Sequence, residues 1–398
     1  MNPQKNKQAS SHMVKTLKIC YFGTYRSEYS RNQIMIEGLQ RAGVEVVICH
    51  EPLWHSIEDR VQIASGGWSK PAFWLRIFRC YRDLTRKYLT IGDYDILVVG
   101  YPGQLDVFWA RLLSWLRKKP LVWDILNSMF LIMTERGIAK RHSFTASLVH
   151  FAERIACRLP DLLLLDTVQF INWFHHEYNA PIKRFRVVPI GVDINDLPNA
   201  LATSEVIERT PDGIFRVIYY GTFIANHGVD IIIESARLLQ DDYQIHFEII
   251  GTGPTREAVE SLVKRYDIRN VTLFDWMSKE KLAVRIAQAD LCLGAFGNTL
   301  QASLTNNNKV YEAFSLKKPV ITGKSPALPT DLIHGIHLYL CDRGNPKALA
   351  KAIRILKGDP ELCNQLGENG YKILLDKFDT IHIGRLCLNY LNEFFGEI

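Results

Sequence analysis

The feature that most constrains the fold of this chain is a pattern that occurs twice: short runs of buried-type residues alternate with stretches of helical spacing. In the first half, residues 16–22 predict a strand, residues 30–42 carry apolar side chains at helical spacing, and residues 44–49 predict a second strand. A strand, a helix and another strand in this order form a βαβ unit whose strands are parallel. Helices cover both faces of such a sheet, so the pattern predicts an α/β fold.

The pattern restarts in the second half and continues towards the C-terminus. Further strands are predicted at residues 95–99, 121–125, 162–165 and 186–189, and then at 216–220, 246–250, 271–274, 291–295, 319–322 and 338–341. We therefore expect two doubly wound α/β domains, which agrees with a length of 398 residues. Ligands of such sheets bind beyond the carboxyl ends of the strands.

Local composition divides the chain further. We expect residues 1–15, which are polar, to be a disordered tail, residues 16–195 to be the first domain, and residues 214–378 to be the second. Residues 196–213 are polar and contain two prolines, which predicts a linker.

The charge is uneven along the chain. Residues 1–200 carry 26 Lys/Arg and 18 Asp/Glu, a balance of +8, whereas the remaining residues carry 22 and 24, a balance of −2. The positive first half indicates an anionic partner, and by charge alone nucleic acid and anionic lipid are both candidates. No nucleic-acid-binding motif accompanies this charge, so we expect no nucleic-acid partner.

The cysteines and the apolar runs indicate the compartment. The eight cysteines are scattered and form no C-x-x-C pair, which predicts buried thiols in a reducing compartment, without a disulfide framework or a zinc site. No run of about 18 apolar residues is present, and the first apolar run is too short for a signal peptide. A cytoplasmic location is therefore expected.

The most informative motif lies in the second half and centres on Glu312. Residues 308–314 read NKVYEAF, a helical pattern, and residues 318–322 read KPVIT, a strand pattern. Three further motifs precede it in the chain: VVPIGVD at 187–193, YYGTF followed by NHG within 219–228, and IIGTGP at 249–254.

The glycines of these motifs have a physical role. Gly221, Gly251 and Gly253 lack a Cβ atom, so the backbone there can turn sharply and approach a ligand. A helix N-terminus behind such a loop offers free N–H groups to a diphosphate. The alternative is that the glycines only serve turns between strands and helices.

In this order, over residues 17–395, the motifs resemble glycosyltransferase family 4, the group 1 glycosyltransferases. The resemblance implies the GT-B fold, in which two Rossmann-like domains face each other across a cleft and a final helix, here 379–398, crosses back to the first domain. It implies retaining transfer of a sugar from a nucleoside diphosphate sugar to a hydroxyl of a glycan or lipid-linked acceptor. Neither a cofactor nor a metal is expected.

The resemblance also assigns residues. Glu312 is expected to accept hydrogen bonds from both ribose hydroxyls, which a carboxylate does well. The other donor-binding residues are expected to be Gly221, Thr222, Phe223, Gly251, Gly253, Pro254, Trp276, Met277 and Asn308. Catalytic roles are expected for Asp124, His227 and Lys309, and acceptor-side roles for Gly23, Thr24, Arg31 and Asn32.

Three positions depart from the commoner family pattern. Thr222 and His227 stand where the family often has Arg and Lys, and Leu304 stands where it often has a second glutamate. Charge on the diphosphate would then be met by Lys309, by His227 if it is protonated, and by backbone N–H groups. A family variant with Gly-Thr-Phe and His-Gly exists, so these changes are compatible with activity.

Several alternatives stay open at this point. Arg31 is either a phosphate ligand or a surface arginine, and Asp124 either orients a hydroxyl or caps a helix. For Asp166 and Thr167, capping is the expected role. A non-catalytic GT-B subunit and a GT-B nucleotide-sugar epimerase are the alternative functions, whereas an NAD-dependent enzyme is disfavoured because no G-x-G-x-x-G follows the first strand.

Two basic, aromatic segments indicate a membrane surface. Residues 71–89 place aromatic side chains on one side of a helix and arginines on the other, and residues 110–119 add a tryptophan and basic residues. Such a helix can lie in a membrane interface, here at the inner face of the membrane. The alternative is an ordinary helix with its apolar side in the core.

Overall fold

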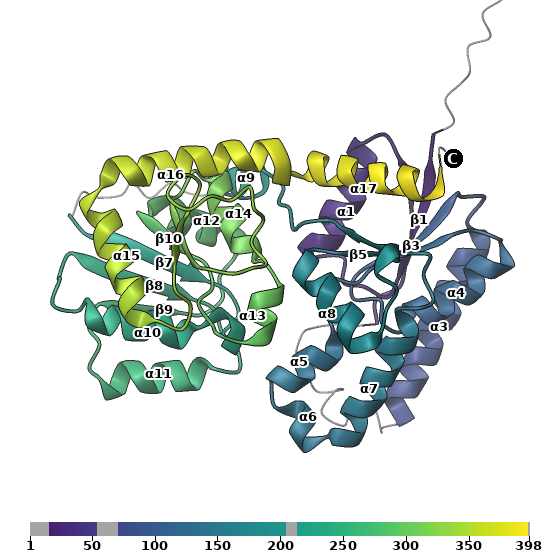
Figure 1. The fold of residues 1–398 in the computed structure, drawn as a ribbon, viewed down its shortest axis with the longest axis horizontal. Helices are drawn as coiled ribbons and strands as arrows, with labels where there is room; N and C mark the ends of the chain where they lie inside the picture. Colours follow the sequence, from purple (N-terminus) through teal and green to yellow (C-terminus); the bar gives the residue numbers. More distant parts are fainter. Residues whose placement is uncertain (1–15, 54–70, 204–212, 397–398) are drawn as a thin grey trace, which may run out of the picture.

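The computed structural model describes residues 16–53, 71–203 and 213–396. It contains two lobes, each built on a six-stranded parallel sheet with helices on both faces (Figure 1). The predicted fold of two doubly wound α/β domains is confirmed. The expected tail, residues 1–15, and residues 204–212 of the expected linker lie outside the described residues.

The first sheet has the strand order β2-β1-β3-β4-β5-β6 and defines the N-lobe. Its strands are β1 (Lys18–Gly23), β2 (Glu45–His50), β3 (Ile96–Val99), β4 (Leu121–Asp124), β5 (Leu162–Leu165) and β6 (Phe185–Val187). Its helices are α1 (Ser30–Arg41), α3 (Pro71–Thr90), α4 (Asp106–Leu116), α5 (Met129–Glu135), α6 (Ile138–Arg141), α7 (Ser143–Ala156) and α8 (Val168–Tyr178). Every residue of β3, β4 and β5 is buried, which explains why these strands are uninterrupted apolar runs in the sequence.

The second sheet, in the C-lobe, has the order β12-β11-β10-β7-β8-β9. Its strands are β7 (Phe215–Tyr220), β8 (Ile245–Ile250), β9 (Val271–Phe274), β10 (Leu291–Leu293), β11 (Val320–Gly323) and β12 (Tyr339–Cys341). Its helices are η3 (Ala225–His227), α10 (Val229–Leu238), α11 (Arg256–Arg265), α12 (Lys279–Gln288), α13 (Leu300–Leu304), α14 (Asn308–Ser315), α15 (Pro346–Gly358) and α16 (Pro360–Ile373). The strand order reverses between β7 and β10, and this switch point is where doubly wound sheets bind ligands.

Two connections join the lobes. The first part of the expected linker is a helix, α9 (Asp196–Ala202), which packs against α12 of the C-lobe. At the other end of the chain, α17 (Thr380–Phe395) follows α16 and runs along the N-lobe (Figure 1). It crosses α1 in backbone contact, because a Cβ atom on Gly384 would lie 1.9 Å from the carbonyl oxygen of Gly38.

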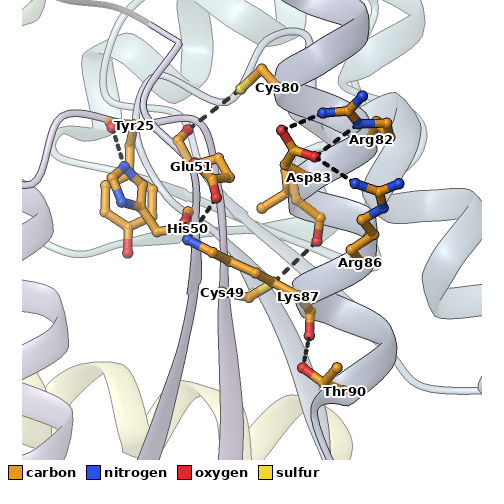
Figure 2. A network of polar contacts seen from close by, with 11 residues as sticks. Tyr25, Cys49, His50, Glu51, Cys80, Arg82, Asp83, Arg86, Lys87 and Thr90 are labelled. Atoms are coloured by element: carbon orange, nitrogen blue, oxygen red, sulfur yellow. Dashed lines mark hydrogen bonds and ion pairs between the residues drawn. The ribbon is translucent and has the colours of Figure 1, made fainter.

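Helix α3 is tied to β2 by polar contacts (Figure 2). Lys87 Nζ lies 2.6 Å from a Glu51 carboxylate oxygen and donates to the carbonyl oxygen of His50 at 3.0 Å. On the exposed side of the helix, Arg82 and Arg86 both contact the Asp83 carboxylate. Part of the positive charge expected on this helix is therefore paired within the helix.

The apolar side of α3 is only partly in the core. Phe73, Leu84 and Tyr88 are buried, whereas Trp74 and Phe78 are 56% and 66% exposed. The aromatic side predicted from the sequence is thus divided between the core and the surface. Among the residues that the structure describes, no helix is long and apolar enough to cross a bilayer.

Candidate functional site

A cleft of about 500 Å³ separates the lobes beyond the carboxyl ends of β7 and β10. The N-terminal ends of two helices border it, α1 from the N-lobe and α14 from the C-lobe. The two ends touch, since Asn308 Nδ2 donates to Ser30 Oγ at 2.8 Å. Helix N-termini carry free N–H groups and partial positive charge, so the cleft favours an anionic ligand.

The turn after β7 and the side chain of Lys309 form one wall of the cleft. Gly221 has φ +148°, and a Cβ atom there would lie 2.9 Å from Lys309 Nζ, so glycine lets the amine approach the turn. Lys309 Nζ lies 4.4 Å from the Tyr219 ring centroid and donates to the Tyr219 hydroxyl at 3.3 Å. Burial lowers the pKa of Lys309 to about 7, while the Glu312 carboxylate opposes this shift.

His227 lies on the same wall but is held in its neutral form. Its Nδ1 donates to the carbonyl oxygen of Thr222 at 2.7 Å and lies 3.0 Å from the Tyr219 hydroxyl. Burial and repulsion from Lys309 lower the pKa of His227 well below its ordinary value. In the free protein His227 therefore carries no charge, and Lys309 with the backbone N–H groups is the first candidate to meet a diphosphate. With Nδ1 protonated, its Nε2 is a hydrogen-bond acceptor.

Glu312 lines the cleft one helical turn beyond Lys309. It is the fifth residue of α14, and this helix confirms the helical pattern predicted for residues 308–314. Burial raises the pKa of Glu312, and the nearby Lys309 opposes that shift. Because residues three apart lie on one side of a helix, α14 presents an amine and a carboxylate together to the cleft.

Arg31 and Asp124, which are 93 residues apart, form a buried pair. Arg31 Nε and Nη2 donate to the two Asp124 oxygens at 2.8 and 2.9 Å, and Nη1 donates to the carbonyl oxygens of Val188 and Pro189. Asp124 is fully buried and does not line the cleft. The direct catalytic role expected for Asp124 is therefore corrected: it positions Arg31, which does line the cleft.

The other acceptor-side residues are structural. Thr24 donates from its backbone N and its hydroxyl to Asp106 at 2.8 and 2.9 Å, and Gly23 lies against the same carboxylate. Asn32 is fully buried, and its amide binds both backbone groups of Tyr101. None of Gly23, Thr24 and Asn32 lines the cleft, so the roles expected for them at the acceptor are corrected.

The second glycine motif supports the turn from behind. A Cβ atom on Gly251 would lie 2.1 Å from the Gly221 carbonyl oxygen, and one on Gly253 would lie 2.6 Å from the Phe223 carbonyl oxygen. The structure brings Gly221, Thr222, Trp276, Asn308 and Glu312 to the cleft, with Lys309 and His227. Of the expected donor-binding residues, Phe223, Gly251, Gly253, Pro254 and Met277 do not line it.

Asp166 and Thr167 follow β5, and only Thr167 has the capping role that was expected of both. The hydroxyl of Thr167 caps α8 by accepting from Phe170 N at 3.1 Å and donates to the carbonyl oxygen of Leu304 from the C-lobe. Asp166 instead lines the cleft. The sequence signal for this position is an acidic residue directly after a buried strand, because ligands bind beyond the carboxyl ends of such strands.

Part of the cleft wall is apolar, and its residues were not predicted because they belong to none of the sequence motifs. Met129, Ile132 and Met133 of α5 line the N-lobe side, next to Arg136. Leu304, at the position of the absent second glutamate, is buried in the N-lobe core. Within the described ranges, no group of three or more His, Cys, Asp or Glu side chains is placed to hold a metal ion.

The C-lobe that carries Gly221, Lys309 and Glu312 matches a known family. Residues 203–373 match the family model described as glycosyl transferases group 1. The match covers less than half of the chain, and it shows that this lobe is similar to the group 1 glycosyltransferases. Two curated relatives extend the match. The lipopolysaccharide core biosynthesis glycosyltransferase LpsD of Rhizobium meliloti (strain 1021) is 24% identical over 170 residues, 43% of this chain and 47% of LpsD.

The D-inositol 3-phosphate glycosyltransferase of Corynebacterium glutamicum (strain R) is 22% identical over 334 residues, 74% of this chain and 78% of that protein. In the match to LpsD, this chain spans about half the length of that relative. The crystal structure of Anabaena HepE in complex with UDP is similar with a TM-score of 0.64, at 16% identity, over 95% of this chain and 100% of that chain. The two lobes together therefore have the GT-B fold.

Proposed function

We propose that this protein is a retaining glycosyltransferase that moves a sugar from a nucleoside diphosphate sugar to a hydroxyl group of a glycan acceptor. The observation that carries the proposal is the arrangement on α14. Lys309 and Glu312 face one cleft, beside the Gly221 turn and between two helix N-termini. An amine with backbone N–H groups suits a diphosphate, and a carboxylate one turn away suits a diol such as ribose.

The remaining cleft residues fit the parts of a donor. Neutral His227 offers Nε2 to a sugar hydroxyl, and Trp276, which is 51% exposed, borders the cleft as a flat surface beside a base. Arg31 is held rigidly by Asp124 on the opposite lobe, so its charge is fixed close to the cleft. Fixed donors and cations stabilise a leaving diphosphate without reorganisation during the reaction.

The comparisons support a choice of first ligands. The HepE structure contains UDP, and the curated relatives are glycosyltransferases of lipopolysaccharide core and of D-inositol 3-phosphate. UDP and its sugars are therefore the first donors to test, and glycans, including lipid-linked ones, are the first acceptors.

The test is a thermal-shift panel with UDP, GDP, ADP and their sugars on the full chain. One nucleotide series is expected to raise the melting temperature, because a ligand that binds only the folded state stabilises it. The Glu312→Gln variant should lose most of that shift, while Glu257→Gln, an exposed glutamate of α11, should keep it. If no nucleotide stabilises the wild type, the proposed function is wrong.

We also propose that α3 and α4 contact a lipid surface. Phe78 on α3 and Trp115 on α4 are 66% and 60% exposed, and the helices are joined by a hydrogen bond from Trp109 Nε1 to Thr85 Oγ1 at 2.9 Å. Exposed aromatic side chains beside basic residues suit a membrane interface.

Flotation with vesicles of phosphatidylglycerol and phosphatidylcholine tests this contact. The double variant Phe78→Ser with Trp115→Ser should bind vesicles at least about fivefold more weakly, since each aromatic side chain contributes buried apolar area. The matched control is Tyr243→Ser, because Tyr243 is 87% exposed on the other lobe. Equal flotation of wild type and double variant would remove α3 and α4 as a lipid-binding surface.

A further inference from the structure

Asp166 is a buried carboxylate without an ordinary partner. It follows β5 directly, is 4% exposed, and lines the cleft between the lobes. Neither of its carboxylate oxygens accepts a hydrogen bond of normal geometry from the described residues. Buried polar groups in folded proteins are almost always hydrogen-bonded, and leaving one unpaired is unfavourable.

The other buried carboxylates of the N-lobe are satisfied. Asp124 is bound by Arg31, and Asp106 accepts from Thr24 and Tyr81. Glu153 accepts from the hydroxyls of Ser128 and Tyr178 and from the backbone N–H groups of residues 129 and 130. Asp166 therefore differs from these carboxylates, because it lines the cleft and neither of its buried oxygens has a hydrogen-bond donor.

The surroundings of Asp166 explain why no side chain satisfies it. Arg31 is the nearby cation, but three of its nitrogens already donate to Asp124 and to two carbonyl oxygens. The capping role at α8 belongs to Thr167. Burial raises the pKa of Asp166 to about 7, the charge of Arg31 and the backbone N–H of Asn306 oppose the shift, and Asp124 adds to it.

The position of Asp166 points to a ligand group. Among the described residues that line the cleft, only Asp166 and Glu312 carry carboxylates, one on each lobe. Glu312 lies beside Lys309, where the nucleotide is proposed to bind. Asp166 belongs to the opposite lobe and lies near the backbone N–H of Asn306, in the segment that leads into α14, so it is placed for the part of the substrates that lies between the lobes.

We infer that Asp166 accepts a hydrogen bond from a sugar hydroxyl group in this cleft, contributed by the donor sugar or by the acceptor. The inference rests on the proposed function and deepens it by naming a positioning residue of the N-lobe. A carboxylate suits a hydroxyl because the hydroxyl donates a charge-assisted hydrogen bond. The bond would also supply the partner that Asp166 lacks in the free protein.

The experiment compares wild type with Asp166→Asn by calorimetric binding of UDP and UDP-glucose, or the pair that the thermal-shift panel selects, and by donor turnover. Asn keeps the size of the side chain but removes the charge. The matched control is Asp161→Asn at the opposite end of β5, where Asp161 accepts from Leu121 N and pairs with Arg111.

Two results would support the inference and identify the source of the hydroxyl. If the donor sugar supplies it, Asp166→Asn should bind UDP-glucose about 10- to 100-fold more weakly and UDP equally well, as expected for losing one charged hydrogen bond. If the acceptor supplies it, both affinities should be unchanged, while release of UDP from the donor, with water or glycan as acceptor, should fall at least about tenfold. The Asp161→Asn control should change neither quantity.

Other results would overturn the inference. Unchanged affinities and unchanged turnover would show that Asp166 contacts no substrate, and an equal loss for UDP and UDP-glucose would show a structural effect on the nucleotide site. If the wild type binds the donor without turning it over, the binding comparison alone is the test, and equal UDP-glucose affinity of the wild type and Asp166→Asn would overturn the inference. Failure of the wild type to bind any nucleotide would instead remove the proposed function and this inference with it.

Discussion

Lys309 makes donor binding depend on pH in a direction that the structure sets. The residue is 7% exposed, and burial lowers the pKa of its amine to about 7 in the free protein. A bound diphosphate places negative charge beside the amine and raises the pKa again. Binding above pH 7 must then take up a proton, so affinity should fall as the pH rises through that range.

The size of the effect follows from linkage. With a pKa of about 7 in the free protein and a value near that of an ordinary lysine when bound, affinity should be about tenfold lower at pH 8 than at pH 6. Proton uptake on binding should be about 0.1 at pH 6 and about 0.9 at pH 8. UDP-glucose is the better ligand for this test than UDP, because both ends of its diphosphate are esterified and neither phosphoryl group titrates in this range.

The assay is calorimetric titration in two buffers of different ionisation enthalpy, at pH 6 and pH 8. Lys309→Met should bind more weakly at pH 6 and should lose the lysine-linked part of the proton uptake, and the exposed Lys281→Met should behave like wild type. Asp166→Asn, combined with each variant, removes the second cleft group that titrates near neutrality. If wild type takes up no proton at pH 8, the interpretation of Lys309 as the diphosphate ligand is refuted.

Two further variants test the cleft. Glu312→Gln should weaken binding of the selected nucleotide by about 1–3 kcal/mol, the range for one hydrogen bond to a charged group, and unchanged calorimetric affinity would exclude Glu312 from the site. Asp124→Asn should destabilise the fold by about 3 kcal/mol in urea unfolding, because it leaves the buried charge of Arg31 without its partner. The exposed Asp83→Asn should leave the unfolding midpoint unchanged, and equal midpoints for both variants would contradict the buried pair.

The sequence predicted the architecture because the determinants are local. Strands such as β5 are buried on both faces, so each is an unbroken apolar run that can be recognised in the sequence. The restart of the pattern at β7 predicted a second sheet. The expected linker between the domains was predicted less well. Its first part is helix α9, whose apolar residues Leu197 and Ala200 are buried beside the C-lobe.

The candidate site was predicted only in part. Glu312, Lys309 and Gly221 carry their signal in a short motif, and the structure brings them together. The pairing of Arg31 with Asp124 had no such signal, since 93 residues separate them and the contact exists only after folding brings the two side chains together. Gly251 has the same local pattern as Gly221, yet it packs behind the turn and not at the cleft.

The sequence by itself therefore determined that there are two sheets, which one comes first along the chain, and that Glu312 lies on a helix. Each of these features depends on residues close together in the chain. What only the tertiary structure decided was the charge and exposure of the side chains at the cleft. Burial beside Lys309 favours the neutral form of His227, and Asp166 lines the cleft as a buried carboxylate without a hydrogen-bond donor. Electrostatic state depends on every neighbour that folding brings near, and those neighbours come from both lobes.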